Sequence, residues 1–163
     1  MNKNKLNEIQ YFERIKIGDL LTRYFSAIDD KKLDLSIAEA TFTIDARVVR
    51  PNGSALVGYN NIFESHKKSF ARFKATHHVI TDYIIDINDN TALVRANLTA
   101  MHLWADNDDN PALNNKHFLA GAVLSIKAVK VDDKWRLSEL INRNVWKTGD
   151  GMMEMANFEK PVN

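Results

Sequence analysis

The sequence lacks several residue types on which common protein chemistries depend. Its 163 residues include no cysteine, which excludes disulfides, thiolate metal sites and cysteine nucleophiles. There are only six glycines, and no Gly-rich phosphate loop or dinucleotide fingerprint occurs. Histidines spaced for a shared metal ion on one helix are also missing. We therefore expect neither a metal nor a cofactor.

An excess of charge of one sign and long apolar runs are missing too. The 22 basic residues nearly balance the 21 acidic ones, which leaves no electrostatic surface for nucleic acid or an anionic membrane. No apolar run approaches the roughly 20 residues that span a bilayer. The basic N-terminus leads into an amphipathic segment and not into a signal-peptide core. We expect a cytoplasmic protein that binds neither nucleic acid nor membrane.

The residues that are present have the pattern of an α+β domain. Hydrophobic residues make up 45% of the chain, and its length fits one domain. Apolar steps of three and four predict a long helix, a short helix and a third helix. Alternation of period two predicts an early strand and then a four-strand antiparallel meander. The expected helices are 6–28, 33–38 and 62–73, and the expected strands are 42–48, 76–87, 91–104, 117–131 and 135–146.

Helices that precede a run of strands indicate one layer of helices on a curled sheet. We expect a domain over residues 1–150 and an irregular C-terminal tail over 151–163.

His102 is the first candidate for chemistry. The residues in phase with it on its strand are apolar and mostly small, among them Ala96, Leu98 and Ala100. Because strand side chains alternate between faces, His102 should point inward, where the alanines leave room for a cavity. A buried imidazole needs a hydrogen-bond partner. His102 is therefore either a core histidine satisfied by a neighbour or a catalytic base.

Asp29 is the partner to consider for His102. It ends the first helix, where the negative end of the helix dipole disfavours an ionised carboxylate. Together with Asp30 it could cap the following helix, or it could point inward. An aspartate bonded to one ring nitrogen would fix the tautomer of His102 and make it a positioned general base.

Two adjacent histidines begin the second long strand. Strict alternation places His77 on the same face as Tyr83 and Ile85, which favours His77 as the inward residue. A β-bulge at the start of the strand would exchange the two and turn His78 inward.

Several segments together resemble a known family. They are Tyr24 to Asp29, Phe42 to Asp45, Thr76 to Asp82, Thr91 to His102 and Lys134 to Trp146. The chain is similar to the SnoaL-like branch of the nuclear transport factor 2-like superfamily, and within it to scytalone dehydratase and bile acid dehydratase. The resemblance implies a cone of curved antiparallel sheet, with three N-terminal helices enclosing a pocket. It also implies cofactor-independent elimination of water beside a carbonyl.

By this resemblance, Asp29 and His102 match the acid–base pair and His78 matches a second pocket histidine. The carbonyl-binding groups of the fungal dehydratase are absent. Ile28 and Ala46 replace two tyrosines, and small apolar residues around Gly121 replace a serine and an asparagine. Three residues are candidates to bind the substrate in their place: Tyr24, Asn142 and Asn144.

The resulting hypothesis is a dehydratase or isomerase that acts on a small, largely apolar hydroxy or keto compound. We also expect a homodimer or homotrimer that covers the exposed face of the sheet. The alternatives are a non-catalytic binding or oligomerisation module, or the small subunit of a ring-hydroxylating dioxygenase.

Overall fold

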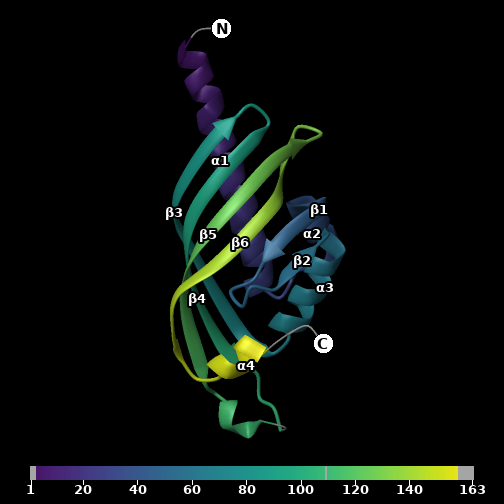
Figure 1. The fold of residues 1–163 in the computed structure, drawn as a ribbon, viewed down its shortest axis with the longest axis vertical. Coiled ribbons are helices and arrows are strands. Elements are labelled where there is room, and N and C mark those ends of the chain that lie inside the picture. Colours follow the sequence, from purple (N-terminus) through teal and green to yellow (C-terminus); the bar gives the residue numbers. More distant parts are fainter. Residues whose placement is uncertain (1–2, 109, 158–163) are drawn as a thin grey trace.

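The computed structural model describes residues 3–108 and 110–157 and has the expected α+β architecture (Figure 1). Its elements, in chain order, are α1 (Lys3–Asp29), α2 (Leu35–Thr41), β1 (Phe42–Val49), β2 (Ala55–Val57), α3 (Tyr59–Phe70), β3 (Phe73–Asn88), β4 (Thr91–Trp104), the 3-10 turn η1 (Pro111–Leu113), β5 (His117–Val131), β6 (Lys134–Gly149) and α4 (Met152–Asn157).

The strands form one curved, six-stranded sheet that does not close into a barrel. Its strand order is β2-β1-β6-β5-β4-β3, and β3 to β6 form the expected antiparallel meander. One pair differs from the expected antiparallel sheet, because β1 runs parallel to β6. Short turns impose antiparallel pairing only on strands that are consecutive in the sequence. The sheet is therefore mixed, and the expected cone is confirmed.

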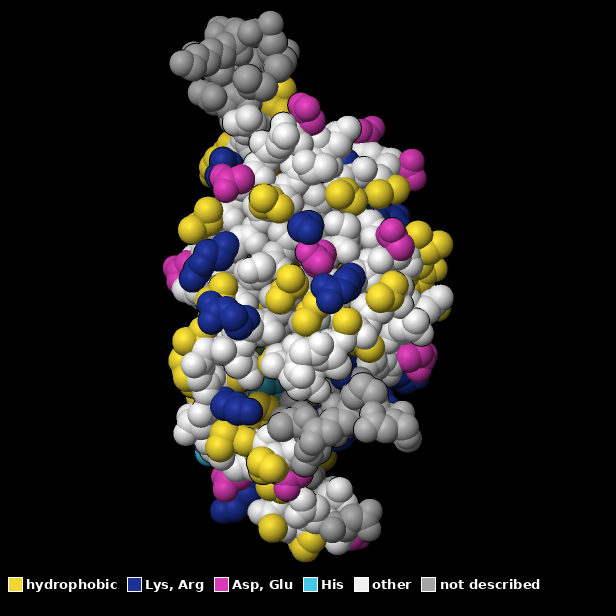
Figure 2. Space-filling view, in the orientation of Figure 1, with side chains coloured by type: hydrophobic (Ala, Val, Ile, Leu, Met, Phe, Trp, Pro, Cys, Tyr) yellow, Lys and Arg dark blue, Asp and Glu magenta, His cyan; other side chains and the backbone are white. Residues whose placement is uncertain are grey.

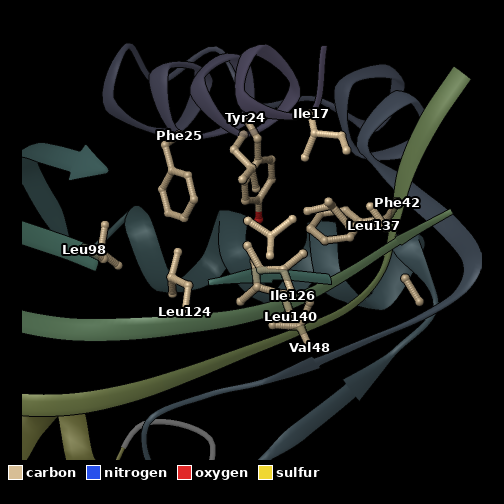
Figure 3. Close-up of a cluster of buried hydrophobic side chains, with 14 of the residues drawn as sticks. Ile17, Tyr24, Phe25, Phe42, Val48, Leu98, Leu124, Ile126, Leu137 and Leu140 are labelled. Atoms are coloured by element: carbon tan, nitrogen blue, oxygen red, sulfur yellow. The ribbon is translucent and has the colours of Figure 1, made fainter. Parts of the chain in front are cut away.

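The core lies between the helices and the inner face of the sheet. Ile17, Tyr24 and Phe25 of α1 point toward the strands, where they meet aliphatic side chains such as Leu124 and Ile126 of β5 (Figure 3). Complete burial of an aliphatic or aromatic side chain is worth about 1.5–3 kcal/mol. This packing holds the C-terminal half of α1 across the sheet, so that its last residue lies at a fixed place beside β3.

The cap of α2 is Asp34, and neither Asp29 nor Asp30 fills this role. The Asp34 side chain accepts a hydrogen bond from the backbone N–H of Ile37 at 2.8 Å. The expectation that Asp29 or Asp30 caps the second helix is wrong, because that helix begins at Leu35, directly after Asp34. Asp29 ends α1 instead, and its carboxylate is available for tertiary contacts.

Strand β3 changes phase along its length, which decides between the two adjacent histidines. Its pairing with β4 shifts between Thr81 and Ile84, where Asp82 has a φ of 55°. Beyond this irregularity, Ile85 is buried, while before it the inward positions fall on even-numbered residues. His78 therefore faces inward and His77 is exposed. Alternation counted from the far half of the strand gave the opposite result, because the bulge lies between the two halves.

The C-terminal segment contains a short helix, α4, where the sequence predicted no regular structure. The chain before α4 is held by Trp104, whose indole N–H donates to the carbonyl oxygen of Asp150 at 3.1 Å. The rest of the expected tail, residues 158–163, lies outside the described residues.

The surface carries charges of both signs (Figure 2). Figure 2 shows basic and acidic side chains interspersed over one face of the molecule. Among the described residues, no helix combines the length and the apolar character needed to span a membrane.

Candidate active site

A cavity of about 250 Å³ lies between α1, α3 and the inner face of the sheet. This volume is between that of a 150 Å³ cavity that accepts benzene and the roughly 300 Å³ at which typical ligand pockets begin. Its walls are mainly apolar, with a few polar groups. The polar lining comprises Tyr24, Arg50, Asn52, His66, Ser69, His78, His102, Asn142, Asn144 and Lys147. Such a cavity suits a substrate of about one ring.

Asp29 does not line the cavity itself, but its carboxylate lies beside His78, which does, and is fixed by three hydrogen bonds. Its Oδ1 accepts from the hydroxyl of Thr76 at 2.7 Å, and its Oδ2 accepts from the backbone N–H of His78 at 2.7 Å. The His78 ring completes the set, with Nδ1 lying 2.6 Å from Asp29 Oδ1. The end of α1 and the first residues of β3 therefore build an Asp–His pair.

The charge of Asp29 determines the tautomer of His78. Burial alone would raise the pKa of Asp29, but the hydrogen bonds from His78 and Thr76 outweigh it and lower the pKa to about 2. Asp29 is then a carboxylate at neutral pH, and its Oδ1 accepts a hydrogen bond from the Nδ1–H group of His78. This leaves His78 Nε2 with its lone pair, on a side chain that is only 4% exposed. That nitrogen is suited to accept a proton from a molecule in the cavity.

His102 lies beside His78 in an aromatic surrounding. Its ring stacks on Phe118 with centroids 4.2 Å apart and planes 4° apart, and it is parallel to Phe70 at 6.5 Å. The His78 ring meets it edge-on at 5.5 Å. Burial is the main cause that lowers the pKa of His102 to about 3, despite the opposing effect of the Asp29 charge. His102 is thus neutral, and its Nδ1 is buried without a hydrogen-bond partner in the described part of the chain.

The expected pair of Asp29 with His102 is not formed in the structure. His102 lies opposite Thr76 on the neighbouring strand, whereas Asp29 contacts β3 itself. A helix end packed against β3 reaches residues of that strand first, and β4 lies one strand further away. His78 therefore takes the partner that the sequence assigned to His102. His102 does face the cavity from the small-residue strand, as alternation predicted.

A second polar pair closes the cavity beneath α1. The Tyr24 hydroxyl is hydrogen-bonded to Nδ1 of His66, which lies on α3. Burial raises the pKa of Tyr24 above its usual range and lowers the pKa of His66 to about 3. The nearby charge of Arg50, whose guanidinium donates to the hydroxyl of Ser65, adds to the effect on His66.

The proposed substrate-binding residues all line the cavity. Tyr24 contributes from α1, while Asn142 and Asn144 contribute from β6. The Oδ1 atom of Asn142 is buried without a hydrogen-bond partner among residues 3–108 and 110–157. The small residues Ala120 and Ala122 line the neighbouring part of the wall, on β5, and provide space instead of polar contacts.

His66 and Arg50 are among the cavity residues that sequence reasoning missed. His66 occupied an apolar position of the third helix, between Ile62 and Phe70, and this was a signal that it faces inward. Its neighbours Lys67 and Lys68 made the segment look like a solvated basic face instead. No pattern in the sequence distinguished Arg50, which follows β1 directly.

Solved structures share this fold over nearly their whole length. The Kfla4162 protein from Kribbella flavida has a TM-score of 0.77 at 21% identity, with 90% of this chain and 98% of that chain covered. A candidate scytalone dehydratase from Novosphingobium aromaticivorans has a TM-score of 0.76 at 19% identity, with 87% and 90% covered. A type 2 hexachlorocyclohexane dehydrochlorinase, LinA, has a TM-score of 0.74 at 15% identity, with 94% and 97% covered.

The fold neighbours thus include dehydratase and dehydrochlorinase proteins. No curated protein matches the sequence. Residues 13–141 match the SnoaL-like domain family, which is most of the chain. The protein therefore belongs to the SnoaL-like family and has the nuclear transport factor 2-like fold.

Proposed function

We propose that the protein is a cofactor-independent lyase that eliminates water, or a comparable leaving group, from a small and largely apolar carbonyl compound. The observation that carries this proposal is the Asp29–His78 pair, in which His78 lies on the wall of an apolar cavity and its Nδ1 is 2.6 Å from Asp29 Oδ1. Removal of a proton beside a carbonyl needs a positioned base whose protonated form is stabilised, because the pKa of the carbon acid lies far above that of an imidazolium. A fixed Asp–His pair meets this need by stabilising the imidazolium that forms.

The reaction begins with transfer of a proton from the carbon beside the carbonyl to Nε2 of His78. The electrons of the broken C–H bond move onto the carbonyl oxygen, which gives an enolate. The enolate then re-forms the carbonyl and creates the C=C bond as the leaving hydroxide departs from the β carbon. The His78 imidazolium gives its proton to the departing hydroxide, which leaves as water. No net proton is gained or lost, and His78 is restored as the base.

His102 has a different role in this proposal. Because burial keeps its ring neutral, it has no additional proton to transfer at neutral pH. With its ring 5.5 Å from that of His78, it is placed to hydrogen-bond the leaving oxygen. The sequence hypothesis made His102 the base, and the contact of Asp29 with His78 supports exchanging the two roles.

The fold neighbours support the reaction class and not the substrate. One neighbour is named as a candidate dehydratase and another as a dehydrochlorinase, and both names denote eliminations. A shared fold at this level of identity does not fix the chemistry, which has to come from the site.

The experiment compares two adjacent histidines that differ in orientation. We would measure elimination from a panel of small β-hydroxy ketones by the wild-type protein, by His78→Asn and by His77→Asn. The His78 variant should lose about 10²–10⁴-fold in rate, because it lacks the general base. His77 is exposed on the other face, so its variant should react at the wild-type rate. Equal rates for the two variants would exclude His78 as the base, and an absence of elimination by the wild-type protein over the whole panel would favour a non-catalytic binding module.

A further inference from the structure

The Tyr24–His66 pair lines the cavity but has no part in the elimination described above. Tyr24 is 2% exposed, and its ring packs edge-on against Phe25 at 5.3 Å and Phe42 at 5.1 Å. Its hydroxyl reaches Nδ1 of His66, and the His66 ring packs edge-on against Phe70 at 5.8 Å. Aromatic contacts on both sides thus hold the two polar groups in one arrangement.

The direction of this hydrogen bond follows from the burial of Tyr24. A buried hydroxyl needs an acceptor for its proton, and in the described part of the chain the partner of Tyr24 is His66 Nδ1. If His66 donated instead, the Tyr24 proton would be left unpaired in the core. Tyr24 therefore donates and Nδ1 accepts, which places the ring proton of His66 on Nε2.

The His66 ring is neutral and lies in a positive field. Burial lowers its pKa to about 3, and the charge of Arg50 acts in the same direction. A neutral imidazole can donate a hydrogen bond to a carbonyl oxygen without transferring its proton. The nearby guanidinium of Arg50 favours negative charge in this part of the cavity.

We propose that the Nε2–H group of His66 donates a hydrogen bond to the carbonyl oxygen of the substrate, and that Tyr24 is the positioning residue that fixes the ring. This inference rests on the proposed function, because the same oxygen gains negative charge when His78 removes the proton. His66 then supplies the carbonyl-binding group that this chain lacks elsewhere, because Ile28 and Ala46 stand where the fungal dehydratase has tyrosines. The substrate class it indicates is an uncharged, enolisable ketone or aldehyde with an apolar body.

The step is balanced within the proposed elimination. The C–H electrons move onto the oxygen that His66 contacts, and the proton moves to His78. His66 keeps its own proton throughout, so no co-reactant is required.

The first test measures recognition without catalysis. The probes are acetophenone and α-methylstyrene, which differ by a carbonyl oxygen in place of a CH₂ group. The test variant is Tyr24→Phe with His66→Phe, which removes both polar partners and leaves no buried group unpaired. His66→Gln is the matched control, because it keeps an N–H donor near the position of Nε2.

We expect the wild-type protein to bind the ketone more tightly than the hydrocarbon by about 3- to 10-fold, the range for one hydrogen bond. The double variant should lose this preference through weaker ketone binding alone, and His66→Gln should keep much of it. No preference in the wild-type protein, or equal weakening of both probes in the double variant, would overturn the inference.

The second test measures proton removal separately from the leaving group. In D₂O, the methyl protons of bound acetophenone exchange if the cavity stabilises the enolate. Loss of one preorganised donor to a developing oxyanion costs about 10²–10³-fold, so the double variant should exchange slower by that order. An unchanged rate would overturn the role of His66. If His78→Asn exchanges as fast as wild type, the proposed function fails instead, while the probe preference still tests His66.

The role of Tyr24 has its own spectroscopic readout. In ¹⁵N-labelled protein, the two ring nitrogens of His66 have shifts that distinguish the tautomers. We expect protonated Nε2 and unprotonated Nδ1 in the wild-type protein, and a mixture of tautomers in Tyr24→Phe. A merely structural tyrosine would leave the tautomer unchanged. A wild-type His66 protonated on Nδ1 would contradict the inference.

Discussion

At the scale of single residues, His78 and His102 show how the surroundings separate two chemically identical side chains. They face the same cavity from neighbouring strands, with ring centroids 5.5 Å apart. His78 has a carboxylate on Nδ1, whereas His102 is stacked on Phe118 and lacks a partner for Nδ1 among the described residues. Burial and stacking disfavour a positive ring at His102, whereas the carboxylate beside His78 fixes the orientation and tautomer of that ring.

This difference predicts how stability depends on pH. The pKa of His102 is about 3 in the folded protein, below the ordinary value of 6.5, so the unfolded chain binds more protons between these values. The free energy of unfolding should therefore fall as the pH drops from about 6.5 toward 3, with a slope of up to about 1.4 kcal/mol per pH unit for this residue.

His102→Phe should reduce that slope, because it removes the titratable ring. The phenyl ring that replaces it fits between Phe118 and Phe70. Urea unfolding at pH 7 and pH 4.5 measures the change, with the exposed His77→Phe as the control. A His102→Phe protein with the wild-type pH dependence would show that His102 is not held neutral.

The sequence predicted the inward direction of His102 but neither that of His78 nor the contact of Asp29, and the reasons are physical. The inward direction of His102 follows from regular alternation on β4, which the structure keeps along the whole strand. The direction of His78 depends on a bulge near Asp82, and a bulge is not visible in the apolar pattern. The contact of Asp29 with His78 is tertiary, because it depends on where α1 crosses the sheet.

At the scale of elements, the buried carboxylate of Glu13 is one of the contacts that attach α1 to the sheet. Glu13 is 8% exposed and accepts hydrogen bonds from the indole of Trp135 at 2.6 Å, from Lys130 at 2.8 Å and from Lys16 at 2.8 Å. Burial would raise the pKa of Glu13, but these bonds outweigh it and lower the pKa to about 2. This contact helps to set the position of α1, and therefore that of Asp29.

Glu13→Gln should lower the free energy of unfolding by about 1–3 kcal/mol at pH 7, because hydrogen bonds to a buried charge are lost. A lowered carboxyl pKa stabilises the fold above its ordinary value of 4.5, and this stabilisation disappears as the pH falls toward 2. The variant should therefore differ from wild type at pH 7 and approach it near pH 2. A difference that stays constant with pH would contradict an electrostatic role, and Glu8→Gln on the exposed part of α1 is the control.

The elements themselves were predictable, except where they depend on contacts distant in sequence. The bounds of β4 and β5 match the predicted ranges, since each strand has one buried face and lies next to its neighbour in the chain. The parallel pairing of β1 with β6 was not predictable, because almost the whole chain separates the two strands. The short β2 has too few residues to show a period.

At the scale of the whole molecule, the outer face of the sheet carries an apolar patch of Val79, Met101 and Trp146. Strand pairing places Val79, Thr99, Gly121 and Trp146 in one row across β3 to β6, on the face opposite the cavity. The three apolar side chains are each 42–46% exposed. The Trp146 ring covers Gly121, where an added Cβ would lie 2.2 Å from it. We propose that a second copy of the chain covers this patch, as the sequence led us to expect.

Met101→Lys should therefore shift the protein toward a monomer, because it places a charge in the centre of the patch. Light scattering coupled to size-exclusion chromatography measures the mass, and Ile44→Lys on the exposed part of β1 serves as the control. A wild-type protein that is already monomeric would refute the proposed interface, as would an unchanged oligomer in Met101→Lys.

The central claim is that Asp29 acts through His78 and not through His102. The most direct measurement is a pair of double-mutant cycles on the rate of proton removal, with Asp29→Asn combined with His78→Asn in one and with His102→Asn in the other. Residues that act as a unit are non-additive. The double variant of Asp29 and His78 should be no slower than the slower single variant, and the losses for Asp29 and His102 should multiply. The account would be contradicted if the rate losses of Asp29→Asn and His78→Asn multiplied while those of Asp29→Asn and His102→Asn did not.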